Sequence, residues 1–401
     1  MIMQDNEKKP ALRFKGFTDP WEQRKLGDIT VELSEYATQE LGLPLLTSSR
    51  SGLMYQDEYR DSRTTKSTET LFSVVPVGTC TYRHMSDDDV FHMNINTLEK
   101  GLVSREYPVF EASKGNNLEF LVQHINSSEE FKAFCAEQKK GGTRTRLYYN
   151  TLCQFTVRVP ALKEQAQISQ CLKKLDTLIT LHQRKYEKLV NIKKSMLDKM
   201  FPKNGASVPE IRFKGFTDPW EQRKVGTLIE DYTEKTVTQN QYPVLTSSQQ
   251  QGIVLQEDYF ADRQVTTDNN VGYYVLPKGY FTYRSRSDTD VFVFNRNNIV
   301  DKGIISYYYP VFAPKSCDSN FLLRRLNHGI KKQLSMAAEG TGQKVLAHAK
   351  FKNMVVDVPS QSEQEKIGTI LEELDTLITL HQRKLEKLQN IKKSCLEKMF
   401  V

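Results

Sequence analysis

The sequence predicts an α+β protein with two mainly β domains in tandem repeat, separated by a long antiparallel two-helix coiled coil with pseudo-two-fold symmetry. Three observations lead to this fold class. The 401-residue chain contains one unit twice, each unit ends in a stretch with coiled-coil spacing, and each begins with short runs of β-branched and aromatic residues. The expected order is a domain at 1–160, a helix at 161–201, a linker at 202–209, a domain at 210–359 and a helix at 360–401.

The repeat is visible at once where each unit begins. Residues 10–25 read PALRFKGFTDPWEQRK and residues 209–224 read PEIRFKGFTDPWEQRK, an offset of about 199 residues. Both tryptophans of the chain, Trp21 and Trp220, fall at the same place in this block. We expect each of them to be a packing anchor where its domain begins, because a buried indole contributes a large apolar area.

The end of each unit repeats more strictly. The stretch LDTLITLHQRK occurs at residues 175–185 and again at 374–384. Between the two blocks the halves agree only in patches, such as Leu46–Ser49 with Leu245–Ser248. The sequence therefore predicts the order domain, helix, domain, helix, with the divergence concentrated in the domains.

Apolar residues in the two end segments alternate at spacings of four and three, which is typical of a coiled-coil seam. Each helix would be about 60 Å long at 1.5 Å per residue. We expect each helix to pair with the other copy in the same chain, in antiparallel orientation. Two histidines fall in the seam, where we expect a polar layer that fixes register. The seam residues expected to pair are Ile168, Leu172, Leu175, Ile179, His182, Tyr186, Leu189, Ile367, Leu371, Leu374, Ile378, His381, Leu385 and Leu388.

A second apolar stripe lies off this seam, at Leu178, Leu181 and Ile192 and at the repeated positions Leu377, Leu380 and Ile391. The pairing of the two helices leaves these side chains uncovered, so we expect them to be available to another protein.

Short β-branched and aromatic runs bounded by turn residues predict the strands of the domains. Examples are residues 71–78, 90–94, 272–277 and 291–295, together with the runs that end at Pro160 and Pro359. We expect a mainly β core with a few short helices in both domains.

Composition sets the class of protein. The formal net charge is +7, which favours a polyanionic partner without proving one. The six cysteines are scattered with no close CxxC pair, so we expect reduced thiols and no metal site. The polar start of the chain and the lack of a long apolar run predict a cytoplasmic protein that does not enter a membrane.

The loops between the predicted strands carry side chains that suit DNA. Arg and Lys hydrogen-bond to O6 and N7 of guanine, and Gln to N6 and N7 of adenine. A glycine loop with Arg or Gln occurs at matching places in both halves, at 142–146 and 340–344, and Tyr82 and Tyr283 would line the groove. The expected DNA-binding residues are Arg50, Arg63, Lys66, Arg83, Thr143, Arg144, Arg146, Gln249, Gln250, Gln251, Arg263, Arg284, Arg286, Gln343 and Lys344. For any one Arg or Lys, a solvated side chain or a phosphate contact is the simpler interpretation.

These features resemble the specificity (S) subunits of type I restriction–modification systems. In that family a P-x-x-x-E-Q-x-x-I block opens each conserved helix, and both copies here fit it, through Glu164, Gln165 and Ile168 and again at Pro359–Ile367. The resemblance covers essentially the whole chain. It implies two target-recognition domains that each read one half of a split site in double-stranded DNA, and a helix pair that sets their spacing.

The resemblance also implies partners. Two methyltransferase (M) subunits would dock on the helix pair, and restriction/translocase (R) subunits would join through them. S-adenosylmethionine, ATP and Mg²⁺ would be used by those partners, with no cofactor bound by this chain. A helix of about 60 Å corresponds to about 18 base pairs at 3.4 Å each, an upper bound on the separation of the half-sites.

Two other classes of protein compete with this interpretation. A coiled-coil adaptor that does not bind DNA would keep the helices but needs no matched basic loops. An enzyme such as a nuclease would need its own constellation of residues. The chain has no Asn/Asp-Pro-Pro-aromatic methylation motif and no GxxxxGK[ST] phosphate loop. The acidic runs, such as Asp87–Asp89, are expected to be a solvated face, so we expect no catalytic residue in this chain.

Overall fold

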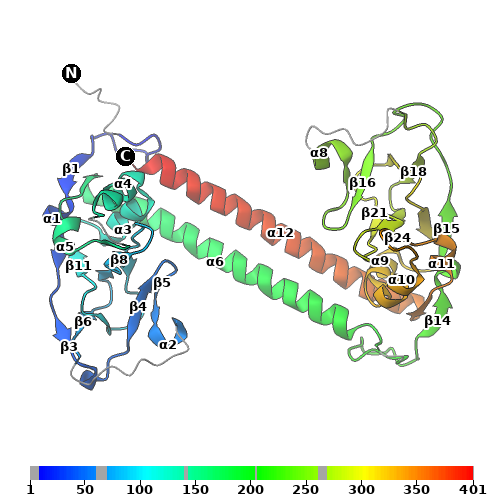
Figure 1. Cartoon of the computed structure of the whole chain (residues 1–401), viewed down its shortest axis with the longest axis horizontal. Coiled ribbons are helices and arrows are strands. Elements are labelled where there is room, and N and C mark those ends of the chain that lie inside the picture. The colour runs from blue at the N-terminus through cyan, green and yellow to red at the C-terminus, as the bar shows by residue number, and fades with distance from the viewer. Residues whose placement is uncertain (1–8, 60–69, 140–142, 204–205, 261–268, 401) are drawn as a thin grey trace. The chain divides into compact units, whose positions relative to one another are not determined.

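The computed structural model describes residues 9–59, 70–139, 143–203, 206–260 and 269–400, and these form two compact units (Figure 1). Unit 1 consists of Met1–His182 and Lys384–Val401, and unit 2 consists of Gln183–Arg383. Each unit holds one β-rich region, the first part of the long helix that follows it and the last part of the other long helix. The fold class is the predicted α+β arrangement, with two β-rich regions, each followed by a long helix, and with the helices packed together.

Unit 1 is built on antiparallel strands. Its main sheets have the orders β2-β11-β7-β9 and β10-β6-β3, and β1-β13, β8-β12 and β4-β5 form separate pairs. The strands are β1 (Glu22–Lys25), β2 (Thr30–Glu32), β3 (Tyr36–Ala37), β4 (Leu46–Ser49), β5 (Gly52–Tyr55), β6 (Phe72–Val75), β7 (Cys80–Thr81), β8 (Met85–Ser86), β9 (Asn94–Ile95), β10 (Gly101–Ser104), β11 (Val109–Ala112), β12 (Thr145–Arg146) and β13 (Thr156–Val159). The helices are α1 (Leu26–Ile29), the 3-10 turn η2 (Gln39–Leu41), α2 (Gln56–Tyr59), α3 (Leu118–Ser127), α4 (Glu129–Glu137), α5 (Tyr149–Leu152) and α6 (Leu162–Lys199).

Unit 2 repeats this plan in the same order along the chain. Its four-stranded sheet has the order β15-β23-β19-β21, and β14-β25, β16-β17, β18-β22 and β20-β24 form pairs. The strands are β14 (Glu221–Lys224), β15 (Ile229–Tyr232), β16 (Leu245–Ser248), β17 (Gly252–Leu255), β18 (Tyr274–Pro277), β19 (Phe281–Tyr283), β20 (Arg286–Ser287), β21 (Phe294–Arg296), β22 (Lys302–Ile305), β23 (Val311–Pro314), β24 (Lys344–Val345) and β25 (Val355–Val358). The helices are α7 (Val225–Leu228), α8 (Gln256–Phe260), α9 (Ser319–Asn327), α10 (Lys331–Ala337), α11 (His348–Lys352) and α12 (Gln361–Met399).

In unit 1 the first part of α6 runs antiparallel to the last part of α12. Ile168 and Leu172 on α6 and Met399 on α12 belong to one buried core. Further along α6, the carboxylate of Asp176 accepts from the Lys392 ammonium at 2.5 Å. The backbone N–H of Leu12 donates to the carbonyl of Lys398 at 2.8 Å, so the start of the chain is tied to the end of α12.

Unit 2 makes the same connections with the helices exchanged. Leu371 and Leu374 on α12 share a core with Leu189 on α6, and the backbone N–H of Ile211 donates to the carbonyl of Lys199 at 2.9 Å. Each β-rich region therefore buries apolar area against both long helices, and burial of this kind is the main source of stability.

The two tryptophans anchor the start of each β-rich region, as expected. Trp21 lies edge-on to Phe120 with 5.6 Å between ring centroids, and Trp220 lies edge-on to Phe321 at 5.7 Å. Both indoles are buried at 3% exposure.

The Glu-Gln pair that opens each long helix has a structural role. Glu164 accepts two hydrogen bonds from the Arg13 guanidinium, at 2.6 and 2.8 Å, and is only 1% exposed. Gln165 accepts from the backbone N–H of Asn117 at 2.9 Å and donates to the carbonyl of Pro160 at 2.8 Å. The motif therefore locks the start of the unit, the start of α3 and the start of α6 to one another.

The same lock occurs in unit 2. Glu363 accepts from Arg212 at 2.7 and 2.7 Å, and Gln364 connects the backbone of Asp318 with the carbonyl of Pro359.

Two predicted strands are wrong over most of their length. Of residues 90–94, only Asn94 lies in a strand, β9, and of residues 291–295 only Phe294 and Asn295 do, in β21. The backbone of Met93 bonds instead to a side chain, because its N–H donates to Asn126 Oδ1 at 2.9 Å and its carbonyl accepts from Asn126 Nδ2 at 2.9 Å. A side-chain amide replaces the neighbouring strand at this point.

None of the described helices is both long enough and apolar enough to cross a membrane.

Candidate nucleic-acid interface

In each unit, three loops carry the candidates Arg50, Arg144, Gln249 and Gln343 or their partners, whereas Arg83 and Arg284 lie just before β8 and β20. The first is the β4–β5 turn of unit 1, which carries Arg50, and its counterpart between β16 and β17, which carries Gln249. The second follows β8 in unit 1 and β20 in unit 2. The third is the glycine loop before β12 and β24, strands that pair antiparallel with β8 and β20.

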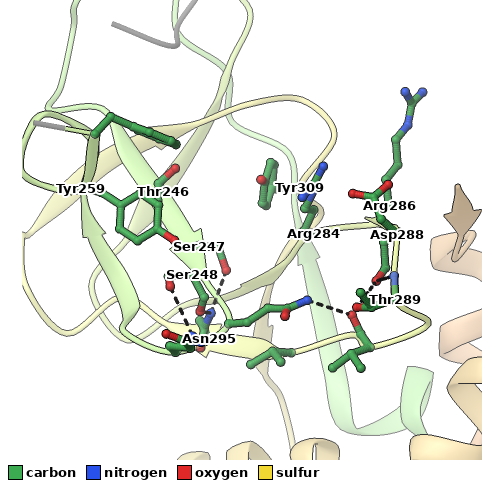
Figure 2. Close-up of a pocket in the computed structure, with 16 residues that line it drawn as sticks. Thr246, Ser247, Ser248, Tyr259, Arg284, Arg286, Asp288, Thr289, Asn295 and Tyr309 are labelled. Atoms are coloured by element: carbon green, nitrogen blue, oxygen red, sulfur yellow. Dashed lines mark hydrogen bonds between the residues drawn. The ribbon is translucent and has the colours of Figure 1, made fainter. Parts of the chain in front are cut away.

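An asparagine, buried in unit 1 and half-buried in unit 2, fixes the first loop in both units. In unit 1 the Asn94 amide donates to Ser48 Oγ and to the carbonyl of Ser49, each at 2.7 Å. In unit 2 Asn295 donates to Ser247 Oγ and to the carbonyl of Ser248, each at 2.8 Å (Figure 2). The turn that carries Arg50 or Gln249 is therefore held to the neighbouring strand in the same way in both units.

In unit 1 the acidic run at residues 87–89 bonds to the basic loops. Arg144 Nε donates to Asp87 Oδ1 at 2.7 Å, and Arg50 Nη2 donates to Asp88. Asp89 accepts from Thr145 Oγ1 and lies 3.5 Å from the Lys139 ammonium. The hydrogen bond from Arg50 lowers the pKa of the Asp88 carboxyl, since it favours the ionised form. The acidic run, expected to be a plain solvated face, orients two of the candidate arginines.

In unit 2 the corresponding loops carry glutamine side chains in place of the two arginines. Gln343 Nε2 donates to Asp288 Oδ1 at 3.0 Å, in the position of the Arg144–Asp87 pair. Gln249 Nε2 donates to the carbonyl of Val291 at 3.3 Å. The loop backbones agree as well, because Asp89 and Asp290 adopt left-handed φ values of 64° and 58°.

A cavity of about 490 Å³ gathers several of the candidates in unit 2. Figure 2 shows Thr246, Ser247 and Ser248 on one side and Arg286 and Asp288 on the other, with Arg284 and Tyr309 between them. The lining residues are Thr246, Ser247, Ser248, Gln249, Gln250, Tyr259, Phe260, Arg284, Arg286, Ser287, Asp288, Thr289, Val291, Val293, Asn295 and Tyr309. The polar lining, with guanidinium and amide groups together, suits the edges of bases and the phosphates beside them.

Two exposed tyrosines, Tyr307 and Tyr308, lie beside this cavity and were not among the residues predicted from the sequence. The Arg286 guanidinium lies 4.2 Å from the centre of the Tyr308 ring, and the Tyr307 hydroxyl donates to that of Tyr308 at 3.1 Å. Unit 1 has Arg105 and Glu106 at the corresponding place, so the repeat itself marks a position that differs between the units.

The remaining candidates are distributed as follows. Arg83, Thr143, Arg146, Arg284 and Gln251 are exposed, and Lys344 is half-buried on β24 opposite Ser287. The backbone N–H groups of Gln250 and Gln251 donate to Ser248 Oγ, each at 3.2 Å. Arg63, Lys66 and Arg263 lie outside the described residues.

The expectation that Tyr82 and Tyr283 line the groove is wrong. Both rings are completely buried in the cores of their units. The Tyr82 hydroxyl donates to the carbonyl of Leu147 at 3.1 Å, and that of Tyr283 lies 3.3 Å from His348 Nδ1. Burial raises the pKa of both phenols. These tyrosines support the strands from which Arg83 and Arg284 emerge.

The helix residues fall into two sets. The seam positions are buried or half-buried in their own units, His182 and His381 included. The stripe positions are exposed: Leu178, Leu181 and Ile391 in unit 1 and Leu377, Leu380 and Ile192 in unit 2 are between 37% and 59% accessible. Among the described residues, no His, Cys, Asp or Glu side chains gather as they would around a metal ion.

Comparison with known proteins gives a consistent result. The family model described as type I restriction modification DNA specificity domain matches residues 92–191 and 218–390. The specificity subunit of the type I restriction enzyme MjaVIII from Methanocaldococcus jannaschii is 23% identical over 291 residues, which is 65% of this chain. The aligned part also spans 65% of that relative.

Solved structures are similar over nearly the whole chain. A crystal structure of the S subunit of a type I restriction–modification system from M. genitalium aligns with a TM-score of 0.58 at 13% identity, covering 98% of this chain and 99% of the other. That likeness is one of fold. A crystal structure of the HsdS subunit from Thermoanaerobacter tengcongensis aligns with a TM-score of 0.41 at 15% identity, covering 95% of this chain and 96% of the other.

Proposed function

This chain belongs to the family of type I restriction modification DNA specificity domains, and on that premise we propose that it selects the DNA sequence for a type I restriction–modification enzyme. Its role is to bind, not to catalyse: unit 1 reads one half of a split site in double-stranded DNA and unit 2 reads the other. The observation that carries the proposal is the pair of matched loop sets, which have the same backbone supports and different side chains.

The division of labour follows from physical chemistry. The DNA backbone offers the same phosphates at every site, so identical side chains in both units suit it. Base edges differ from one half-site to the other, so side chains that differ between the units suit them. Arg83 and Arg284 belong to the first group, and Arg50 and Gln249 to the second.

The long helices supply the other half of the proposed function. We assign the stripe residues Leu181 and Leu380, with their neighbours on α6 and α12, to the docking of two methyltransferase subunits. Because the stripe is repeated once in each unit, it presents one apolar surface twice to two copies of one partner. Restriction/translocase subunits would join through those methyltransferases, and S-adenosylmethionine, ATP and Mg²⁺ would be used there. The antiparallel helices would set the separation of the two half-sites.

The experiment is to map methylated adenines in cells that carry the complete system and in cells that lack this chain. We expect a motif of two short specified halves around an unread gap, lost when the chain is absent. A continuous motif, or methylation that persists unchanged in cells lacking the chain, would contradict the proposal.

Two further assays separate the competing classes of protein. An adaptor that does not bind DNA would leave a duplex unretained in a filter-binding assay with the purified chain. A nuclease would cut plasmid when the isolated chain is incubated with Mg²⁺.

A further inference from the structure

We propose that the two units read different bases through the same two loop positions. Unit 1 reads G·C pairs through Arg50 with Asp88 and Arg144 with Asp87, and unit 2 reads adenine through Gln249 and Gln343. This inference rests on the proposed function and adds the class of base that each half of the site contains.

The first step is that the positions are equivalent. Arg50 and Gln249 both follow a Leu-Thr-Ser-Ser strand that the side-chain amide of an asparagine, Asn94 or Asn295, holds in place. Arg144 directly precedes β12 and Gln343 directly precedes β24, the strands that pair with β8 and β20. Each side chain donates to the equivalent aspartate of the next loop, Arg144 to Asp87 at 2.7 Å and Gln343 to Asp288 at 3.0 Å. The two units therefore place different side chains, Arg in unit 1 and Gln in unit 2, at equivalent positions of the same backbone arrangement.

The second step concerns charge in unit 1. A guanidinium and the carboxylate to which it hydrogen-bonds together have little net charge, so the attraction of the pair to phosphates is weak. Its remaining N–H groups still match O6 and N7 of guanine, and the carboxylate can accept from N4 of the paired cytosine. The side chains of Arg50 and Asp88 are 64% and 50% exposed, and those of Arg144 and Asp87 are 53% and 65% exposed. Each pair is thus accessible and already oriented.

The third step concerns unit 2, where neutral side chains replace both arginines and Asp88, while Asp288 is kept in place of Asp87. Thr289 stands where unit 1 has Asp88, and Gln249 where it has Arg50. The Gln343 amide donates to Asp288, which orients it and leaves its carbonyl oxygen for the N6 amino group of adenine. A glutamine amide presents one donor and one acceptor side by side, the arrangement that adenine N7 and N6 require.

The fourth step is a contrast within the same loops. Arg83 and Arg284 are arginine in both units. In the strand pair β8–β12 of unit 1, Arg146 lies opposite Met85, and in the pair β20–β24 of unit 2, Arg286 lies opposite Val345. Each unit therefore has one arginine at this position of the pair, on one strand or the other. A charge kept in both units suits the phosphates that both half-sites share, whereas the Arg-to-Gln exchanges suit the bases that they do not share.

The test uses the full-length chain and a pool of duplexes with two randomised blocks, and it sequences the duplexes retained by the chain. The double variant R50Q/D88T gives unit 1 the residues of unit 2. We expect one position in one half-site to change from guanine to adenine, with a preference of about 5- to 150-fold, and the other half-site to stay unchanged. The reverse variant Q249R/T289D should change adenine to guanine in the other half-site.

Single variants and a control sharpen the result. D88T alone leaves the Arg50 charge without its carboxylate, so binding to all duplexes should strengthen while discrimination falls. R83Q should weaken all duplexes to the same extent. An unchanged thermal unfolding midpoint, expected because the exchanged residues are exposed, ensures that each variant is compared as a folded protein.

The outcomes separate the two claims. If the wild-type chain enriches no two-part motif, the proposed function fails. If it enriches such a motif but both exchanges leave every base preference unchanged, the proposed function stands and this inference is overturned.

Discussion

The long helices and the candidate DNA-binding loops of this chain have diverged to very different degrees. α6 and α12 share an uninterrupted stretch of eleven residues, LDTLITLHQRK, and expose the same leucines in both units. The loops keep their backbone supports, yet Arg50 is replaced by Gln249 and Arg144 by Gln343. This contrast is expected if the helices serve the same role in both units while each set of loops binds a different DNA sequence. The helices repeat one surface, and the loops vary side chains on a fixed frame.

The largest effect is expected from breaking the ion pair that joins the start of each unit to its long helix. E164Q removes one partner of a buried bidentate ion pair and leaves the Arg13 charge uncompensated, which costs about 3–5 kcal/mol of unfolding free energy. E363Q should cost unit 2 the same amount, since Arg212 is paired in the same way. Urea denaturation of the full chain measures both. The matched control is E129Q, whose partner Lys132 is on the surface and whose loss should cost less than about 1 kcal/mol. Equal losses for E164Q and E129Q would contradict the role of the lock.

The next effect is on one half of the DNA site. R144A should weaken recognition of the half-site of unit 1 by about 1–3 kcal/mol if the contact is to a base, with the other half unaffected. Q343A should do the same to the half-site of unit 2. Competition binding with duplexes altered in one half measures this. Equal losses at both halves after either substitution would show that the units do not divide the site.

A smaller and less selective effect is expected from the shared arginines. R83A and R284A should each weaken binding by a similar factor for every duplex sequence and reduce the slope of log affinity against log salt by about 1, because each removes one phosphate contact. Titrations at several salt concentrations measure the slope. A loss confined to one base pair would assign these residues to base reading instead.

The smallest effect distinguishes the stability of the units in acid. Burial lowers the pKa of His84 and of His92 in unit 1, where unit 2 has Ser285 and Val293. Since the folded pKa lies below the unfolded value of about 6.5, the unfolded state binds more protons. The stabilisation is complete above that pH and is lost as pH falls through the folded pKa.

Unit 2 has one histidine of the same kind, His328, so unit 1 should lose protection earlier. Hydrogen exchange measured peptide by peptide between pH 7 and pH 5 follows each unit separately. H84S/H92V, which installs the residues of unit 2, should remove the excess acid sensitivity of unit 1. An unchanged pH profile in that variant would assign the sensitivity to other groups.

The repeat and the heptad spacing were enough to predict the fold class, because apolar residues at regular spacing mark the buried face of a helix. The lock between Arg13 and Glu164 was not predictable in this way, since the two residues are 151 positions apart and each alone resembles an exposed charge. The strand expected at 90–94 failed because Asn126, from a distant helix, bonds the backbone of Met93.

The site was predicted in outline only. Arg and Gln at matched loop positions gave the candidate DNA-binding residues, which stay a prediction, but composition could not reveal that Asp87 and Asp88 hydrogen-bond to two of them. Tyr82 and Tyr283 were misjudged, because a tyrosine beside an arginine in the sequence points to the opposite face of a strand. Comparing the two units position by position would have singled out Tyr307 and Tyr308 without a structure.

We propose that the two units are equivalent halves, each reading its own half-site, with the end of each long helix completing the other unit. The most direct measurement is the sequence selected from a random duplex pool by a chain that ends at Phe201. In that fragment Met200 of a second copy can replace Met399, so we expect a dimer that selects a palindrome made of the half-site of unit 1. Selection of a non-palindromic site, or of a single isolated half, would contradict the account.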